Sequence, residues 1–359
     1  MSALILTKES GDNGYRVTLN PLLKPFVTEV TIPAEHKGLP VRVIGKNAFS
    51  GAKRLKSISI PASISCSCEA AFCDCSVESV HITDLSAWCK INFETPTANP
   101  LHSGARLYLN GKLLKKIDLN GEIQKIGSYA FYGCKQLISL SLTGVDFIGE
   151  DAFRKSGLKN ITVPEEVTHI GDGAFANCYN LTDAKILGGS KISRAMFEGC
   201  EHLTDIRIDN SVTAIERSAF YGCTRLAHVE LPRNLRVIGY SAFKECRALK
   251  EIELPSEIEY IGEFAFEMSG IESITIPHGV DSIQTATFQI CKKLEEVKIP
   301  RSVTRIEKSA FHLCDSLKTV NYAGTAEEWE EVSFPSGYPF KNSVRIYCYE
   351  SSYHGKNAE

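Results

Sequence analysis

Four cysteines within one short segment are the residues of this chain most capable of chemistry. Cys66, Cys68, Cys73 and Cys75 are spaced C-x-C-x4-C-x-C, and Cys89 follows shortly after them. Thiolates at this density are able to bind Zn²⁺ or to form a redox pair. Because the segment lacks the C-x2-C spacing typical of zinc sites, we favour loose packing, with a metal site or a local disulfide as the alternatives.

The other cysteines of the chain, which has thirteen in all, indicate packing more than disulfide formation. Eight cysteines stand three residues after a recurring phenylalanine: Cys75, Cys134, Cys178, Cys200, Cys223, Cys246, Cys291 and Cys314. Elsewhere the same position holds Ala52, Ser156 or Ser269, so it favours a small and slightly polar buried residue. The odd total and the continuous row argue against a paired scheme, and we expect buried free thiols.

No other group of residues has the spacing of a known catalytic site. The sequence contains no P-loop, no G-x-G-x-x-G after a strand, no H-E-x-x-H and no G-x-S-x-G elbow. Its nine histidines are scattered, and both His81 and His228 fall at outward strand positions. Since catalysis needs one converging cleft, we expect a protein that is not an enzyme and that has no cofactor.

The elements that position these residues come from a repeat that covers almost the whole chain. Ala-Phe or a close variant recurs eleven times, with intervals of 22 or 23 residues and one interval of 59. The recurring phenylalanines are Phe49, Phe72, Phe131, Phe153, Phe175, Phe197, Phe220, Phe243, Phe266, Phe288 and Phe311. The repeat unit is V-T-x-I-G-x-x-A-F-x-x-C-x-x-L-x-x-I-x-I-P, which is nearly intact at residues 303–320.

Each unit predicts one strand and one tight turn. Leu249, Ile252 and Leu254 follow the alternation of a half-buried strand, and Pro255 ends it because proline cannot donate to a ladder. The Ala-Phe segment predicts a single helical or 3₁₀ turn that buries the phenylalanine. A unit of this size cannot bury its apolar face alone, so neighbouring units must stack with their strands in a parallel sheet.

The units resemble the BspA-like (Treponema-type) leucine-rich repeat family over about residues 41–322. This resemblance implies an α/β repeat solenoid of leucine-rich-repeat type, with a parallel sheet on the concave side and short helical or 3₁₀ turns on the convex side. It also implies a bacterial, non-catalytic scaffold for protein-protein or adhesion-type binding through the concave face.

Two atypical segments interrupt or end the repeats. Residues 83–121 fill the long interval, and residues 323–359 share their plan of a Trp five residues before a Phe, followed by an Arg-apolar-Tyr strand. We expect each to form a helix and a strand that cover an end of the stack. The prediction is one continuous solenoid, with an N-terminal cap at 1–40, repeats at 41–82, a cap-like insertion at 83–121, repeats at 122–322 and a C-terminal cap at 323–359.

Outward-facing strand residues form the predicted binding stripe on the concave face. The candidate binding residues are His81, Lys185, Arg207, His228, Glu230, Glu251, Glu253 and Lys298. The stripe lacks the Tyr and Trp anchors of a tight protein interface. It therefore also fits a solvated face, and the alternative function is a structural spacer with inert faces.

Composition and charge narrow the class of partner. The 359 residues are 43% hydrophobic and 23% charged, which predicts a folded soluble protein, and 40 Lys+Arg against 43 Asp+Glu give a net charge of −3. We therefore expect a monomer that binds an unknown protein or glycan, with no nucleic acid and no membrane insertion. The family resemblance implies the cell surface or secretion. The first residues lack the apolar core of a signal peptide, so a chain complete as written is expected to be cytoplasmic.

Overall fold

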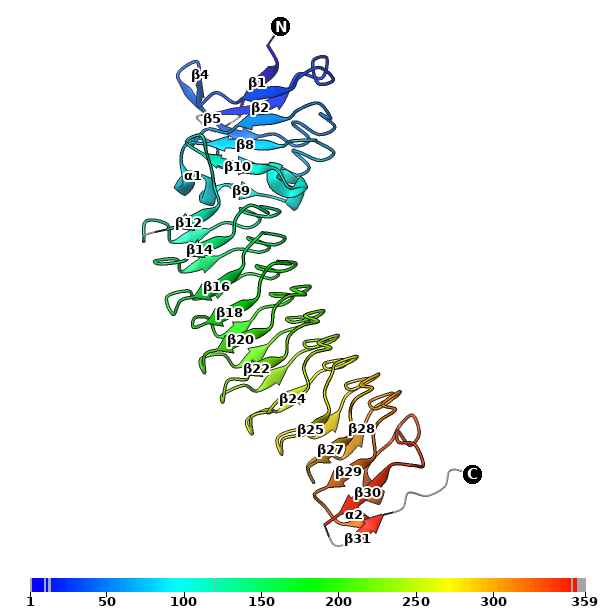
Figure 1. Cartoon of the computed structure of the whole chain (residues 1–359). Coiled ribbons are helices and arrows are strands. Elements are labelled where there is room, and N and C mark those ends of the chain that lie inside the picture. The colour runs from blue at the N-terminus through cyan, green and yellow to red at the C-terminus, as the bar shows by residue number, and fades with distance from the viewer. Residues whose placement is uncertain (1, 10, 12–13, 120, 350, 354–359) are drawn as a thin grey trace. The chain divides into compact units, whose positions relative to one another are not determined.

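The computed structural model describes residues 2–9, 11, 14–119, 121–349 and 351–353, and it divides the chain into two compact units. Unit 1 comprises the chain up to Ile161 together with Glu166–Cys178, and unit 2 comprises Thr162–Glu165 together with the chain from Tyr179 onward. Within each unit, one repeat forms one rung of a parallel β-solenoid, with strands of successive rungs side by side (Figure 1). The predicted fold class is confirmed.

The longest strands of the rungs form a front row, in which neighbours pair in parallel register. In unit 1 this row contains β3 (Glu29–Thr31), β6 (Ser57–Ser59), β8 (Ser79–Ile82) and β10 (Arg106–Leu109), and then β12 (Lys116–Asp118) and β14 (Ser139–Ser141). In unit 2 it contains β18 (Asp183–Ile186), β20 (Asp205–Ile208) and β22 (His228–Glu230), and further on β25 (Ser273–Thr275), β27 (Glu296–Ile299), β29 (Thr319–Tyr322) and β30 (Arg345–Cys348). β16 (Asn160–Val163) includes residues of both units. Apolar side chains of these strands point inward and polar ones outward, as the period of two predicts.

Shorter strands form a second row behind the front row. Unit 1 contributes β5 (Leu39–Ile44), β7 (Cys66–Ser67) and β9 (Asn92–Phe93), and separately β13 (Lys125–Ile126), β15 (Phe147–Ile148) and β17 (His169–Ile170). Unit 2 contributes β19 (Lys191–Ile192), β21 (Ala214–Ile215), β23 (Val237–Ile238) and β24 (Tyr260–Ile261), and separately β26 (Ser282–Ile283) and β28 (Arg305–Ile306). The glycine that follows these strands allows rungs to approach, because a Cβ on Gly149 would lie 2.4 Å from the Ser128 backbone nitrogen.

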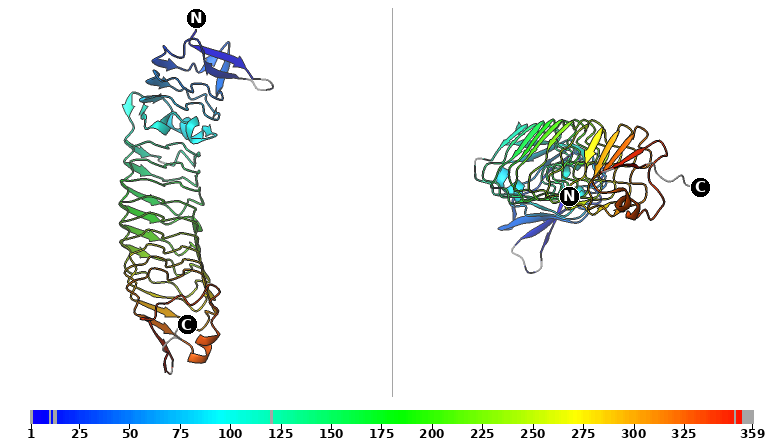
Figure 2. Two further views of the ribbon diagram at one scale, coloured as in Figure 1. Left: turned by 90° about the vertical axis from the view of Figure 1, so that its right-hand side faces the viewer. Right: turned by 90° about the horizontal axis from the view of Figure 1, so that it is seen from below.

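The Ala-Phe segments form a third row, the turn row, that is also hydrogen-bonded from rung to rung. Phe220 N–H donates to the Ala242 carbonyl at 2.9 Å, and the Ser218 and Gly222 N–H groups donate likewise to Tyr240 and Lys244. The positive φ angles of Ser218 and Gly222 orient their backbone N–H groups toward the next rung. The expected helical turn therefore appears only as separate i→i+3 turns, such as Tyr221 N–H to the Ser218 carbonyl. The turns stack as layers within each unit (Figure 2).

The core of each unit is a stack of phenylalanine rings beneath the turn row. In unit 2, Phe220 and Phe243 lie with ring centroids 5.2 Å apart, and Phe243 and Phe266 lie 5.4 Å apart, with nearly parallel planes. All three side chains are buried. Burial of one such ring contributes about 1.5–3 kcal/mol to stability, so the ladder is a main source of it.

The repeat cysteines lie beside this ring ladder as free thiols, as the sequence predicted. Cys223 Sγ donates to the Phe197 carbonyl at 3.1 Å, and Cys291 Sγ donates to the Phe266 carbonyl at 3.0 Å, each one rung earlier. All thirteen cysteines are free, and seven of the eight repeat cysteines are buried, Cys75 being the half-buried one. A small residue with a polar hydrogen fits this position because it adds a hydrogen bond to the turn.

Both atypical segments contain the predicted helix and strand. α1 (Leu85–Lys90) is followed by the 3₁₀ helices η1 (Pro96–Ala98) and η2 (Pro100–Ser103), and β10 then forms a hairpin with β11 (Lys112–Leu113). α2 (Ala326–Glu331) is followed by β30 and β31 (Ser351–Tyr353). At the N-terminal end, β1 (Leu4–Lys8) pairs with β2 (Tyr15–Leu19), and β4 (Glu35–His36) pairs with β5. No helix in the described part of the chain has both the length and the apolar character needed to cross a membrane.

The insertion packs against the next repeat of unit 1 through polar contacts. The Trp88 indole N–H donates to the Ala130 carbonyl at 2.9 Å, and the buried Asn99 amide donates to the Tyr129 carbonyl at 2.7 Å. The side chain of Asp84 caps the start of α1 by accepting from the Ala87 N–H at 2.9 Å. The insertion therefore makes specific contacts with the rung that follows it.

One predicted strand is not formed. Residues 249–254, whose alternation predicted a strand, are not assigned to one, although Ile252 still points inward and Glu251 and Glu253 point outward. Within the described chain, no backbone hydrogen bond joins residues 251–254 to a neighbouring rung. The segment carries two outward glutamates, its exposed Lys250 is paired with Glu272 at 3.6 Å, and Glu230 stands on the rung before it. Like charges on adjacent strands disfavour pairing, whereas β18 and β20 each combine an Asp with a Lys or Arg.

Candidate functional site

A groove of about 1220 Å³ lies on the front row of unit 2. Its rim contains five of the predicted binding residues, which are exposed: Arg207 from β20, His228 and Glu230 from β22, and Glu251 and Glu253 from the unpaired rung. Strand alternation places all five outward, and the rung period of 23 residues aligns them in neighbouring rows. The structure thus brings the centre of the predicted stripe into one depression.

The floor and the lower wall of the groove were not predicted. The half-buried Leu254 and Pro255 give the floor apolar surface, and the loops after the strands add Asn210, Arg233 and Ser256. The lower wall is ordered across rungs, since the Arg233 N–H donates to Asn210 Oδ1 at 2.8 Å. These three loop residues occupy equivalent repeat positions, so the same periodicity that identified the stripe could have identified them.

The five predicted residues on the rim have no partners in the described chain. Arg207, His228, Glu230, Glu251 and Glu253 form neither an ion pair nor a side-chain hydrogen bond with any described residue. Other charges of the same unit are paired: Lys191 with Glu216 at 2.8 Å beside the second row, Lys244 with Glu267 at 2.7 Å in the turn row, and Arg236, which also lines the groove, with Glu259. The rim charges are therefore free to meet charges of a partner.

The charges of the outward residues also change from one strand of the rim to the next. Lys185 lies beside Arg207 in the β18–β20 register, and Arg207 lies beside Glu230 in the β20–β22 register. Glu251 and Glu253 follow on the next rung. This row of outward residues therefore changes from basic to acidic, whereas the parallel outward row places Asp183 and Asp205 on the same strands as Lys185 and Arg207, so both signs of charge occur at the basic end.

Three predicted binding residues lie outside the groove. Lys185 flanks it on β18 without lining it, and Lys298 stands on β27 beside Thr275 and Asn321 in register. His81 belongs to unit 1, where its ring stacks on Tyr108 with centroids 4.9 Å apart. The predicted stripe consequently lines the groove only over the rungs from β20 to residues 251–254.

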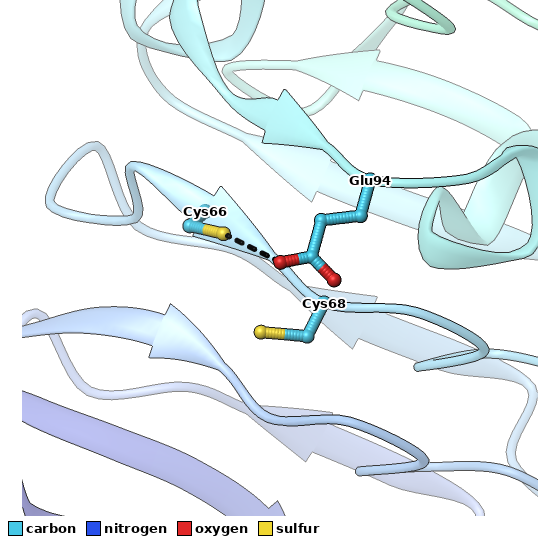
Figure 3. Close-up of side chains that lie close together, drawn as sticks. All are labelled: Cys66, Cys68 and Glu94. Carbon is cyan, nitrogen blue, oxygen red and sulfur yellow. Dashed lines mark hydrogen bonds between the residues drawn. The ribbon is translucent and has the colours of Figure 1, made fainter.

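The four clustered cysteines separate into two places, which corrects the predicted metal set. Cys66 and Cys68 lie with Glu94 on the second row of unit 1, and their ligand atoms are all within 4.8 Å of one another (Figure 3). Cys75 instead donates to the Phe49 carbonyl at 2.8 Å in the turn row. Cys73 is also in the turn row, where its carbonyl accepts from Gly51 N–H. Cys66 and Cys68 stand six and four residues before Phe72, on the second row, whereas Cys73 and Cys75 stand one and three residues after it, in the turn row. Sequence proximity therefore does not bring all four thiols together.

The thiols of this pair are weak nucleophiles at neutral pH. Burial raises the pKa of the Cys68 thiol to about 12, and burial also raises the pKa of the Cys66 thiol above its ordinary value. Because the thiolate is the reactive form, the free pair has little tendency to attack a substrate.

The repeat architecture agrees with a match to a known family. A family model described as the BspA type leucine rich repeat region, in six copies, matches residues 26–94, 104–227 and 213–338. The chain belongs to this BspA-type family. A leucine-rich cell surface protein from Faecalibacterium prausnitzii is similar in structure, with 25% identity, a TM-score of 0.57, and coverage of 94% of this chain and 98% of that one. The pneumococcal vaccine antigen PcpA is similar in fold, with 16% identity, a TM-score of 0.52, and coverage of 96% and 91%.

No curated protein matches the chain in sequence. BspA-type chains are leucine-rich repeat scaffolds for binding or surface display and are generally not enzymes. The described chain agrees with this class in one specific respect, because it has an open, charged groove on the strand row.

Proposed function

We propose that this BspA-type chain is a non-catalytic binding scaffold that holds a protein partner in the groove of unit 2. The observation behind the proposal is the set of five rim charges without partners: Arg207, His228, Glu230, Glu251 and Glu253. An ion pair already formed within the chain adds little to binding, whereas a free charge gains a new partner and steers association.

A polypeptide segment fits the groove better than a neutral glycan does. Both signs of charge occur on the rim, and ionised side chains of a protein are able to complement both. The floor is apolar at the half-buried Leu254 and Pro255, so it offers a surface for one or two apolar side chains of the partner. A charged rim around an apolar floor is the usual arrangement of a protein interface.

The proposed setting is the bacterial cell surface. The Faecalibacterium prausnitzii protein is described as a leucine rich cell surface protein, and it is similar over nearly the whole of both chains. We extend the proposal to an adhesion-type role at that location, with extracellular proteins as the class of partner.

A displayed-peptide library selected on the wild-type chain tests the groove directly. The test variant is R207E/E230K/E253K, and the matched control is K191E/E216K, which reverses an ion pair outside the groove. We expect selected peptides to bind the wild type and the control alike, and to bind the groove variant at least about tenfold more weakly, with affinity falling as salt rises.

Equal binding of the selected peptides to all three proteins contradicts the groove assignment. Failure to select any peptide, together with ordered self-assembly of the chain, favours instead a structural spacer with inert faces.

A further inference from the structure

A second site of distinct chemistry lies on the second row of unit 1. Cys66 is in β7, Cys68 is two residues further along on the same side, and Glu94 follows β9 on the next rung. Their Sγ and carboxylate oxygen atoms lie within 4.8 Å of one another, and Figure 3 shows the carboxylate next to both cysteines. We propose that Cys66, Cys68 and Glu94 bind one Zn²⁺ ion with a fourth position open to water.

The spacing of the three ligand atoms suits Zn²⁺ after a small closure. Tetrahedral zinc with Zn–S bonds of about 2.3 Å and Zn–O bonds of about 2.0–2.2 Å places its ligand atoms roughly 3.5–3.8 Å apart. Cys66 Sγ already lies 3.9 Å from Glu94 Oε1. Side-chain rotations that move the ligand atoms by less than about 1 Å therefore complete the site. Thiolate together with carboxylate is a donor set that zinc accepts.

The carboxylate is held in place by a second contact. Glu94 Oε2 accepts a hydrogen bond from the Glu69 backbone N–H at 2.7 Å, which leaves Oε1 facing Cys66. A hydrogen bond of this kind, which fixes one oxygen and directs the other, is the usual support of a metal-ligating carboxylate. Glu94 is thus oriented before any ion binds.

The second row of unit 2 contains a glutamate at the position equivalent to Glu94, and its partner shows which kind of residue Cys66 replaces. There Glu216 Oε2 accepts from the Arg194 backbone N–H at 3.2 Å, and Glu216 Oε1 binds the Lys191 ammonium group at 2.8 Å. The residue equivalent to Lys191 in unit 1 is Cys66, since each directly precedes the inward residue of its second-row strand. Glu94 consequently forms no ion pair with any described residue, and a bound cation supplies the charge that lysine supplies in unit 2.

The extended backbone disfavours the competing disulfide. Residues i and i+2 of a strand lie about 6.6 Å apart at Cα, close to the upper limit of about 6.8 Å for a disulfide. Between the two cysteines, the buried Ser67 hydroxyl donates to the Ala98 carbonyl at 2.7 Å and holds the segment extended. A Cys66–Cys68 bond requires this anchored segment to contract, whereas zinc binding leaves it in place.

Titration of the full, reduced chain with Zn²⁺, and with Co²⁺ as a spectroscopic probe, tests the site. We expect one ion per chain and a thiolate-to-cobalt charge-transfer band. C66S and C68S should each lower the Zn²⁺ affinity by at least about 100-fold, and E94Q by about 10- to 100-fold. C73S is the matched control, since it removes a thiol of the same segment that lies outside the site, and its affinity should equal that of the wild type.

A second readout does not depend on how well the variants fold. In the wild type, Zn²⁺ should slow alkylation of Cys66 and Cys68, mapped by peptide mass, and should leave Cys73 unaffected. The proposal is overturned if no metal binds, if binding persists in a C66S/C68S double variant, or if Zn²⁺ protects Cys73 instead. The proposal is also overturned if mild oxidation of metal-free protein yields an intramolecular Cys66–Cys68 disulfide and the reduced protein then binds no zinc.

Discussion

At the residue scale, the cysteine row is explained by hydrogen bonding within the turns. Six thiols donate to the carbonyl of the repeat phenylalanine one rung earlier, and these are Cys75, Cys178, Cys223, Cys246, Cys291 and Cys314. Each carbonyl also accepts an N–H within its own turn, so the thiol uses its second lone pair. Ala52 fits this account, because no repeat turn precedes it and it has no such carbonyl to meet.

Substitution at Cys223 should therefore depend on whether a donor remains. Cys223→Ser keeps a hydroxyl in reach of the Phe197 carbonyl, whereas Cys223→Ala removes both the donor and the sulfur volume. We expect the free energy of unfolding to fall by about 1–2 kcal/mol in the alanine variant and by clearly less in the serine variant. Urea unfolding of the three proteins measures this, and equal losses in both variants would contradict the hydrogen-bonding account.

The same burial predicts alkaline instability. Burial raises the pKa of the Cys178 and Cys291 thiols to about 11 and that of the Cys134 thiol to about 12, against 9.0 for a solvated thiol. Above about pH 9 the unfolded chain releases protons that the folded chain retains. This stability is fully present below pH 9 and is lost as pH rises through the folded values.

We expect the urea midpoint to be lower at about pH 10 than at about pH 8, with a smaller drop in a C178S/C291S variant. An equal drop in that variant would assign the alkaline loss to groups other than these thiols.

At the element scale, the two helical modules share a plan but differ in one contact. The Trp88 indole N–H donates to Ala130 in the next rung, while the Trp329 indole nitrogen is buried without a partner among the described residues. Both rings are almost completely buried. Trp88 lies within the repeat array, so its N–H is able to donate to a carbonyl of the following turn. The C-terminal module has no described repeat turn after it, so Trp329 lacks an equivalent acceptor.

Replacement of each tryptophan by phenylalanine should expose this difference. Trp88→Phe removes a buried hydrogen bond, whereas Trp329→Phe removes an unpartnered N–H along with similar volume. We expect Trp88→Phe to lower the free energy of unfolding by at least about 1 kcal/mol more than Trp329→Phe does, as measured by chemical denaturation. A larger loss at Trp329 would indicate that its indole nitrogen has a partner in solution.

The periodicity of the sequence was sufficient to predict the front-row strands, the stacked phenylalanines and the buried cysteine row, which follow from spacing and polarity. It did not predict the second row, because each unit was expected to form one strand and one tight turn. It was not sufficient at residues 249–254, which alternate correctly but form no strand. Alternation reports which way side chains point, whereas pairing also depends on the charges of adjacent rungs, here Glu230, Glu251 and Glu253.

The candidate sites were predictable to different degrees for a similar reason. The groove rim follows from two outward strand positions per rung, but its lower wall at Asn210 and Arg233 lies in loops that the strand pattern ignores. The thiol cluster required knowledge of which part of a rung each cysteine occupies. Glu94 lies in the atypical insertion, outside the repeat template, so spacing could not connect it with Cys66.

At the scale of the whole molecule, the chain has one tryptophan in each compact unit, Trp88 in unit 1 and Trp329 in unit 2. The sequence predicts one continuous solenoid, in which stability passes between neighbouring rungs. Two units that unfold independently are the alternative. Single-tryptophan variants, W88F and W329F, allow unfolding of each unit to be followed separately by fluorescence.

Loss of a core ring in unit 2 distinguishes these possibilities. Phe243 is completely buried and stacks on Phe220 and Phe266, so Phe243→Ala should destabilise its surroundings by about 3–5 kcal/mol. In a continuous solenoid, the substitution lowers the urea midpoint reported by Trp88 as well as that reported by Trp329, because rungs are coupled to their neighbours. A midpoint that falls only at Trp329 would contradict the continuous array. The reciprocal variant Phe131→Ala, in unit 1, should then lower only the midpoint reported by Trp88 if the units are independent, and both midpoints if they are coupled.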